Sequence, residues 1–138
     1  MKIINQFPPN IDEIRKVLKD VPDTMLFCFG DTIYNPSGSV IYPFVEAHEE
    51  CHAKQQGKDP REWWRRYLVD PSFRASQEIP AHQIEYQAAK VFIKDRNKLH
   101  GFLVRRAMEL SGPAYGSIMS FQEALEAIKR KEIFKFKV

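Results

Sequence analysis

Apolar residues recur every three or four positions between Ile11 and Leu18, which is the spacing of one face of a helix. Asn10 stands where an N-cap residue would lie, and Glu13 follows three residues later, as in a capping box. Pro22 lies beyond the far end and cannot continue the helix. The pattern therefore predicts a first helix over this stretch.

The next two runs, TMLFCFG and DTIYNPSGSVIY, are rich in aromatic and β-branched residues, which favour strands. The turn-forming residues NPSG divide the second run into two parts. We therefore expect a strand at about 24–29 and a hairpin whose strands lie at about 31–34 and 39–42.

Helical spacing returns after the third predicted strand. Pro43 suits the first position of a helix and Gly57 suits its end, so a helix over about residues 43–56 is expected. Asp59 and Asp70 are each followed by proline, a combination that begins a helix with an N-cap carboxylate. The helix after Asp70 is expected to kink or restart at Pro80. Further helices are expected at about 81–95, 97–110 and 120–131.

The order of these elements is a helix, a small antiparallel sheet and then a run of packed helices. This order predicts an α+β fold, with a single domain over residues 1–138. A chain of 138 residues is long enough to bury a core of its own. Its composition, 43% hydrophobic and 28% charged, is ordinary for a globular protein.

Charge and cysteine content narrow the classes of function. The net charge of +3 is weakly basic, and the arginine pairs at 65–66 and 105–106 are too scattered to predict a nucleic-acid-binding face. No apolar run approaches the roughly 18 residues of a membrane span, and the N-terminal stretch does not read as a signal peptide. Cys28 and Cys51 form no CxxC pair, and Cys28 is expected to be a small buried hydrophobe. We therefore expect a cytoplasmic protein that binds neither nucleic acid nor membrane.

The segment AHEECHAK, residues 47–54, holds two of the four histidines, four positions apart. Because residues i and i+4 share a helix face, His48 and His52 can direct two imidazole nitrogens at one Zn²⁺ ion. Glu49 follows the first histidine, as in the HExxH motif of zinc peptidases, where the glutamate is the general base. The run SVIY just before this helix is placed to act as an edge strand that binds the main chain of a substrate.

A catalytic zinc site needs a third protein ligand and an open fourth position. The segment QEIPAHQIEY offers Glu78, His82 and Glu85, which a helix would place within about 60° of one another on one face. A carboxylate would complete a site with two histidines and one glutamate, whereas His82 would complete a three-histidine site. The residues that are not ligands are candidates to orient the ligand histidines through their outer ring nitrogens.

Three segments together, HEECHAKQQG, WWRRYLVDPSFRASQE and PAHQIEYQAA, resemble a group of small, often phage-encoded zincin metallopeptidases. The pattern of that group is HExxHxxQ, a helix with tryptophan and tyrosine, a D-P-x-F-R turn and ExxAxxxQ. The resemblance covers roughly residues 40 to 120. It implies a minimal zincin-like fold with one zinc ion and the glutamate of ExxA, Glu78 here, as the third ligand. Two departures leave that ligand open, because residue 85 is glutamate rather than glutamine and His82 stands where an aromatic or acidic residue is more usual.

Several other residues are secondary candidates. Tyr115, in the glycine-rich segment GPAYG, is a candidate to stabilise the oxyanion of a tetrahedral intermediate, and His100 is an alternative. Gln55 shares a helix face with the motif and is a candidate partner of His52. Cys51 is expected to be buried rather than to bind metal. Three aromatic residues are expected mainly to pack helices together: Trp63, Trp64 and Tyr67.

These features predict a zinc-dependent hydrolase, a metallopeptidase that cleaves a peptide or protein substrate with Glu49 as general base. The alternative is a non-catalytic structural or virion-associated protein with a closed zinc site. A closed site needs a fourth protein ligand. Cys51 or a second member of the group Glu78, His82 and Glu85 could supply it.

Overall fold

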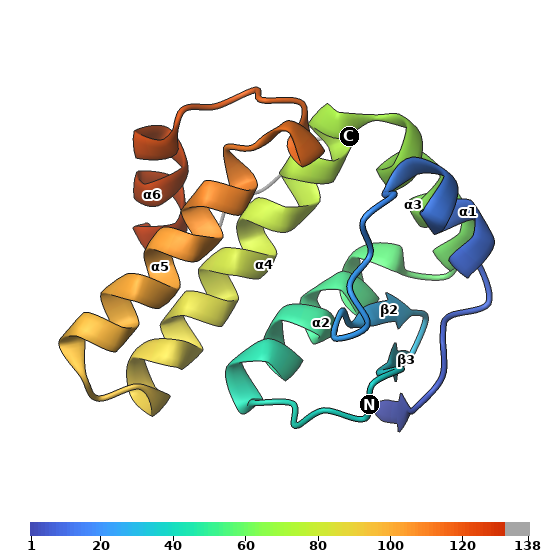
Figure 1. Cartoon of the computed structure of the whole chain (residues 1–138), viewed down its shortest axis with the longest axis horizontal. Helices are drawn as coiled ribbons and strands as arrows, with labels where there is room; N and C mark the ends of the chain where they lie inside the picture. The colour runs from blue at the N-terminus through green and yellow to red at the C-terminus, as the bar shows by residue number, and fades with distance from the viewer. Residues whose placement is uncertain (132–138) are drawn as a thin grey trace.

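The structure, a computed structural model, describes residues 1–131 of the chain. Its elements, in chain order, are β1 (Lys2–Ile4), α1 (Ile11–Val17), β2 (Phe27–Phe29), β3 (Thr32–Tyr34), α2 (Pro43–Gln56), α3 (Pro60–Val69), α4 (Pro71–Phe92), α5 (Arg96–Leu110), the 3₁₀ turn η1 (Pro113–Tyr115) and α6 (Phe121–Lys129) (Figure 1). A small sheet followed by a run of helices confirms the predicted α+β fold. The end of the predicted domain, 132–138, lies outside the described residues.

The sheet has three short strands in the order β1-β3-β2. β2 runs antiparallel to β3, as expected, whereas β1 runs parallel to β3 on its other side. The sheet is therefore mixed, and the prediction of a purely antiparallel sheet is wrong. β1 escapes sequence analysis because its three residues, KII, are too few to show the alternation of a strand.

The predicted strand at 39–42 does not form, because β3 already has a neighbour on each edge. Asn35 extends the pairing with β1 by donating its backbone N–H to a β1 carbonyl. The NPSG segment forms the expected turn, in which Gly38 has a φ of 68°. The chain then runs past the exposed Val40, and Tyr42 becomes the N-cap of α2. The run SVIY is therefore not an edge strand, and its predicted substrate-binding role loses its basis.

Prolines and aspartates set the helix starts as predicted. Pro43 lies in the first turn of α2, and Gly57 ends that helix with a φ of 56°. Asp59 and Asp70 each accept hydrogen bonds from backbone N–H groups in the first turn of α3 and α4. Asn10 precedes α1 but makes no capping bond, so its predicted capping role is wrong. Its buried amide has no hydrogen-bond partner within the described part of the chain.

α4 continues through Pro80 without a restart, so the predicted helix at 81–95 is its second half and ends at Phe92. A proline inside a helix removes one N–H donor and crowds the preceding turn. α4 tolerates this because it contacts α2 and α3 on one side and α5 and α6 on the other (Figure 1). Most of its residues are buried, and this tertiary packing outweighs the local penalty.

Two apolar clusters lie on either side of the contact between α2 and α4. One joins α4 to α5 and α6, with fully buried residues such as Leu110 and Ile128. The other joins α1, β2 and α3, and includes Phe27. The predicted role of three aromatic residues in packing helices together is confirmed, since all are buried in the second cluster: Trp63, Trp64 and Tyr67.

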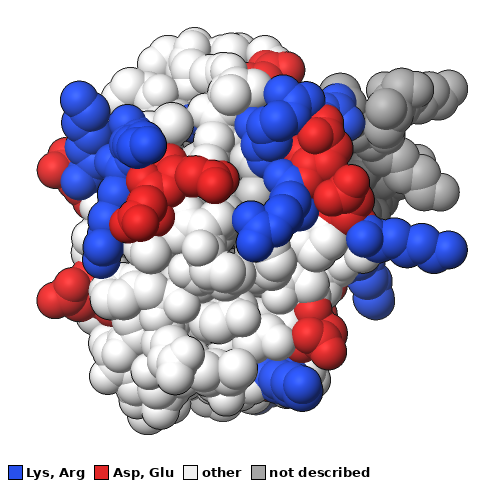
Figure 2. Space-filling view, turned by 90° about the vertical axis from the view of Figure 1, so that its right-hand side faces the viewer, with Lys and Arg blue, Asp and Glu red and all other residues white. Residues whose placement is uncertain are grey.

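Helix hydrophobicity and surface charge are the features that concern binding to membranes and nucleic acid. Within residues 1–131, no helix combines the length and the apolar character needed to span a membrane. On the face shown in Figure 2, Lys and Arg side chains lie beside Asp and Glu side chains. The expectation that the protein binds no nucleic acid stays a prediction.

Gln56 fastens the end of α2 to the sheet. Its buried side-chain amide accepts a hydrogen bond from the Gly30 N–H and donates one to the Cys28 carbonyl, both at 2.7 Å. We expect Gln56→Ala to lower the free energy of unfolding by about 1–3 kcal/mol, because it leaves the partly buried Gly30 N–H without its acceptor and removes one of the two donors to the Cys28 carbonyl. Urea unfolding would measure the loss. Lys54→Ala, an exposed position on the same helix, serves as the control, and an equally small change for both variants would contradict the prediction.

Candidate metal centre

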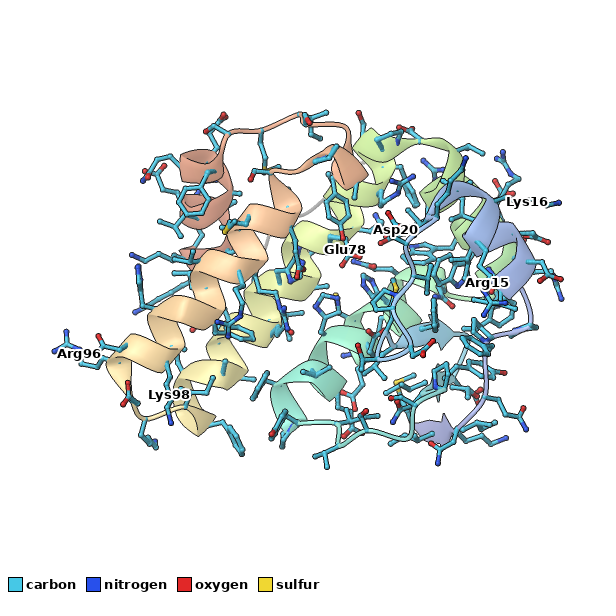
Figure 3. The ribbon with its side chains drawn as sticks, in the orientation of Figure 1. Arg15, Lys16, Asp20, Glu78, Arg96 and Lys98 are labelled. Atoms are coloured by element: carbon cyan, nitrogen blue, oxygen red, sulfur yellow. The ribbon has the colours of Figure 1, made fainter. Side chains whose placement is uncertain are left out.

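Six ionisable side chains are buried where α2 packs against α4. All six residues line the same cavity, and each has no more than 9% of its surface exposed. The six are His48, Glu49 and His52 from α2, and Glu78, His82 and Glu85 from α4. Figure 3 shows Glu78 pointing from α4 toward the interior of the molecule. Helical spacing produces both sets, as the sequence predicts.

Three of the buried side chains converge on one point. The Nε2 atoms of His48 and His52 lie 3.1 Å apart, and Glu78 Oε1 lies 3.1 Å from the first and 3.0 Å from the second. Zinc bonds of about 2.0–2.1 Å in a tetrahedral site place ligand atoms about 3.3–3.4 Å apart. A small outward movement would therefore let these three atoms bind one Zn²⁺ ion.

Gln55 fixes the orientation of His52. Its side-chain oxygen lies 2.8 Å from His52 Nδ1, and its amide nitrogen donates to the Gln77 carbonyl at 2.8 Å. The bond to Gln77 decides which end of the amide faces His52, so Nδ1 must carry the proton and donate it. The lone pair of Nε2 then faces His48 and Glu78, which is the arrangement that a metal-binding histidine requires. Gln55 thus has the role that the sequence suggests.

Glu85 lies behind His48 and has three positive or polar neighbours. Its Oε1 accepts hydrogen bonds from His82 Nδ1 at 2.9 Å and from Arg106 Nε at 3.2 Å. His48 Nδ1 is 3.5 Å from the same oxygen, at the limit of hydrogen bonding. The negative charge of Glu85 favours the proton of His48 on Nδ1 and leaves Nε2 free to bind a cation.

The second oxygen of Glu78 is also occupied. The hydroxyl of Tyr67, on α3, lies 2.5 Å from Glu78 Oε2. Tyr115, in η1, lies close enough to Tyr67 for the two phenols to interact electrostatically. Since Tyr67 has one proton and gives it to Glu78, that proton is not available to a second acceptor.

Mutual charge interactions stabilise this cluster without a metal. Burial opposes the charge on His48 and His52, but nearby carboxylates outweigh it and raise the pKa of both histidines. Glu78 and Glu85 act on His48, whereas Glu78 and Glu49 act on His52. Burial likewise opposes the charge on Glu78, yet the two histidines hold its pKa well below the usual value. The converging atoms are all acceptors when the histidines are neutral, so they bind a cation, which is either a proton or a metal ion.

Glu49 lies next to the three converging residues and lines a cavity of about 1100 Å³ with them. Its carboxylate has no hydrogen-bond partner among residues 1–131, and the residue as a whole is 8% exposed. Burial raises the pKa of Glu49, and the positive charges of His48 and His52 oppose this rise. A carboxylate in this position can accept a proton from a molecule in the cavity.

A second group, His48, His82 and Glu85, also lies close enough together to be considered as a metal site. Arg106 contacts Glu85 in this group, and its positive charge opposes the binding of a second cation there. His82 does not belong to the first group, although its Nε2 is buried without a hydrogen-bond partner in the described part of the chain. The geometry therefore favours Glu78 over His82 and Glu85 as the third ligand, and the assignment stays a prediction.

The remaining residues singled out from the sequence differ in their position relative to the cavity. Tyr115, in η1, lines the cavity and lies near Tyr67. His100 is exposed on α5 and is not among the residues that line the cavity. Cys51 is partly buried, and its sulfur accepts a hydrogen bond from Gln55 at 3.5 Å. Cys28 is buried, as predicted.

Two residues of the site escape sequence analysis. Tyr67 is interpreted from the sequence as a packing residue only, although a tyrosine at a buried position usually needs a partner for its hydroxyl, and this is the signal that could have revealed it. Arg106 belongs to α5 and reaches Glu85 across the helix interface, a contact that no local pattern indicates. Comparison with known proteins adds no assignment, since no family model, curated protein or solved structure matches the chain.

The geometry predicts the order in which substitutions weaken zinc binding. We expect Glu78→Ala to reduce zinc affinity more than Glu85→Ala or His82→Ala, because it removes a ligand atom. Loss of a residue that only orients a ligand usually costs about 10–100-fold. Competition with a chromogenic chelator would give the dissociation constants, with the exposed Glu50→Ala on α2 as the control. If His82→Ala proves the most damaging, a three-histidine site replaces this assignment.

Proposed function

We propose that the protein is a zinc-dependent hydrolase, a metallopeptidase that cleaves a peptide or protein substrate. One observation carries the proposal. Three ligand atoms lie within 3.1 Å of one another, while the outer atoms of His52 and Glu78 are hydrogen-bonded and that of His48 faces a carboxylate. The resemblance of the motifs to small zincin metallopeptidases supports the same conclusion.

The number of ligands favours an enzyme over a structural zinc protein. Within residues 1–131, no fourth histidine, cysteine or carboxylate joins His48, His52 and Glu78 in their group. Of the candidates for closing the site, Cys51 contacts Gln55 instead. His82 and Glu85 belong to a separate group with His48. Three protein ligands with an open position are typical of catalytic zinc, whereas structural sites have four.

Each side chain has a separate task in the proposed chemistry. A bound zinc ion would lower the pKa of a coordinated water to about 7. Glu49 would accept a proton from the attacking water and pass it to the leaving amine. Tyr115 is on the cavity wall, where its hydroxyl would be the candidate donor of a hydrogen bond to a developing oxyanion.

The cavity supports a polypeptide substrate. Its volume of about 1100 Å³ lies above the range of about 300–1,000 Å³ usual for small-ligand pockets. It extends from the segment between α1 and β2, at Val21 and Met25, to η1 on the opposite side. An extended chain of several residues could therefore lie across Glu49.

Metal content tests the first half of the proposal. We expect one zinc ion per chain in protein purified without added metal, and none in a His48→Ala/His52→Ala variant. Chelation should lower the melting temperature of the parent alone, because the metal binds only the folded state. Elemental analysis and thermal unfolding measure the two effects. Equal zinc content in both proteins would contradict the metal site.

A substitution of Glu49 separates an enzyme from a structural zinc protein. Glu49→Gln keeps the size of the side chain but removes the proton acceptor, and general-base catalysis is typically worth about 10²–10⁴ in rate. The variant should keep its zinc and its melting temperature and lose nearly all hydrolysis. Glu50→Gln, the exposed neighbour on α2, should retain parent activity.

The substrate for this test can come from a proteome screen of the host or phage. Fragments that appear with the parent and with Glu50→Gln, but not with Glu49→Gln, identify it. An empty screen with zinc-loaded protein would favour the structural or virion-associated alternative. Loss of zinc from Glu49→Gln would mean that Glu49 binds the metal.

A further inference from the structure

The two carboxylate oxygens of Glu78 have different partners. Oε1 faces the Nε2 atoms of His48 and His52, whereas Oε2 lies 2.5 Å from the hydroxyl of Tyr67. An ionised carboxylate only accepts hydrogen bonds, so Tyr67 is the donor. One oxygen is thus available to a metal ion, and the other is held on the far side by a short, charge-assisted hydrogen bond.

The ring of Tyr67 is fixed by its neighbours on both sides. It stacks on Trp63 with ring centroids 4.9 Å apart and meets the edge of Trp64 at 5.2 Å. Arg74 lies over the ring and donates from Nε to the Tyr67 carbonyl at 2.7 Å. The guanidinium of Arg74 also donates to the Leu68 and Ala114 carbonyls, so α3, the start of α4 and η1 are joined around this residue. The hydroxyl therefore cannot leave Glu78 by a simple rotation of the ring.

The number of oxygens that Glu78 offers decides the coordination number of a bound metal ion. A carboxylate that binds zinc through both oxygens fills two coordination positions. Together with His48 and His52 it would supply four donor atoms, so a bound water would be the fifth. A carboxylate that binds through one oxygen leaves a fourth position for water or substrate.

We infer that Tyr67 is a positioning residue whose hydroxyl restricts Glu78 to one metal-binding oxygen and so keeps the metal ion four-coordinate, with water or substrate in the fourth position. This inference rests on the zinc site proposed above. It assigns to the tryptophan- and tyrosine-rich helix α3 a chemical role in addition to packing. The buried aromatic cluster around Trp63 and Trp64 then serves to hold one hydroxyl group in place.

Cobalt substitution tests the inference without a substrate. A four-coordinate Co²⁺ centre has intense visible absorption bands, and these bands weaken when a fifth donor atom binds. We expect the parent with Co²⁺ to give the intense four-coordinate spectrum. Tyr67→Phe keeps the ring but removes the hydroxyl, so Glu78 can bind through both oxygens while water is retained, and the bands should weaken. The matched control is Tyr86→Phe, which removes a hydroxyl from a buried tyrosine that does not line the cavity.

A rescue variant separates the hydroxyl from the packing of the ring. Replacement of Tyr67 by p-aminophenylalanine restores a hydrogen-bond donor at the same ring position and should restore the parent spectrum. A weakened spectrum in the p-aminophenylalanine variant would overturn the inference. This outcome can be measured even if Tyr67→Phe fails to fold. The inference is overturned as well if Tyr67→Phe has the parent spectrum. A parent protein that binds neither zinc nor cobalt would instead overturn the proposed function, so the two failures are distinguishable.

Discussion

Charge compensation between α2 and α4 is the constraint on which the rest of the structure depends. The two helices bury several ionisable groups against each other, and removal of such groups from water costs several kcal/mol each, as an order of magnitude, unless a partner is present. Glu78 meets two histidines and a hydroxyl, and Glu85 meets Arg106 and His82. Protons or a metal ion between His48, His52 and Glu78 complete the compensation. The helices can pack closely only because every carboxylate at their contact, apart from Glu49, has such partners.

The residues that hydrogen-bond to the buried histidines and carboxylates come from three different helices. The helices that form the fold are therefore the same helices that build the site. Gln55 belongs to α2, Tyr67 to α3 and Arg106 to α5. Each in turn is held by packing or by backbone hydrogen bonds, as Gln55 is by the Gln77 carbonyl. Glu49 differs, because its carboxylate faces the cavity without a hydrogen-bond partner in residues 1–131. An unpaired carboxylate among compensated charges is the feature that most resembles a reacting group.

Most features that depend on residues close together in the sequence were predicted correctly. Asp59, Asp70 and Gly57 act within one helical turn, and their roles at helix ends were predictable. Predictions failed where a distant segment decided the outcome. The strand at 39–42 did not form because β1, at the start of the chain, occupies the edge of β3. The helix expected to kink or restart at Pro80 did not restart, because its neighbours bury it on both sides.

The sequence by itself determined that His48 and His52 share a helix face and that Glu78, His82 and Glu85 share another, because covalent geometry fixes the positions of residues four and seven apart in a helix. Only the tertiary structure decided which residue of the second set meets the histidines. The packing of α2 against α4 brings Glu78 Oε1 to both Nε2 atoms and leaves Glu85 behind His48. It also brought Tyr67 and Arg106 into the site. Distances between helices depend on how all their side chains pack together, and no short segment contains that information.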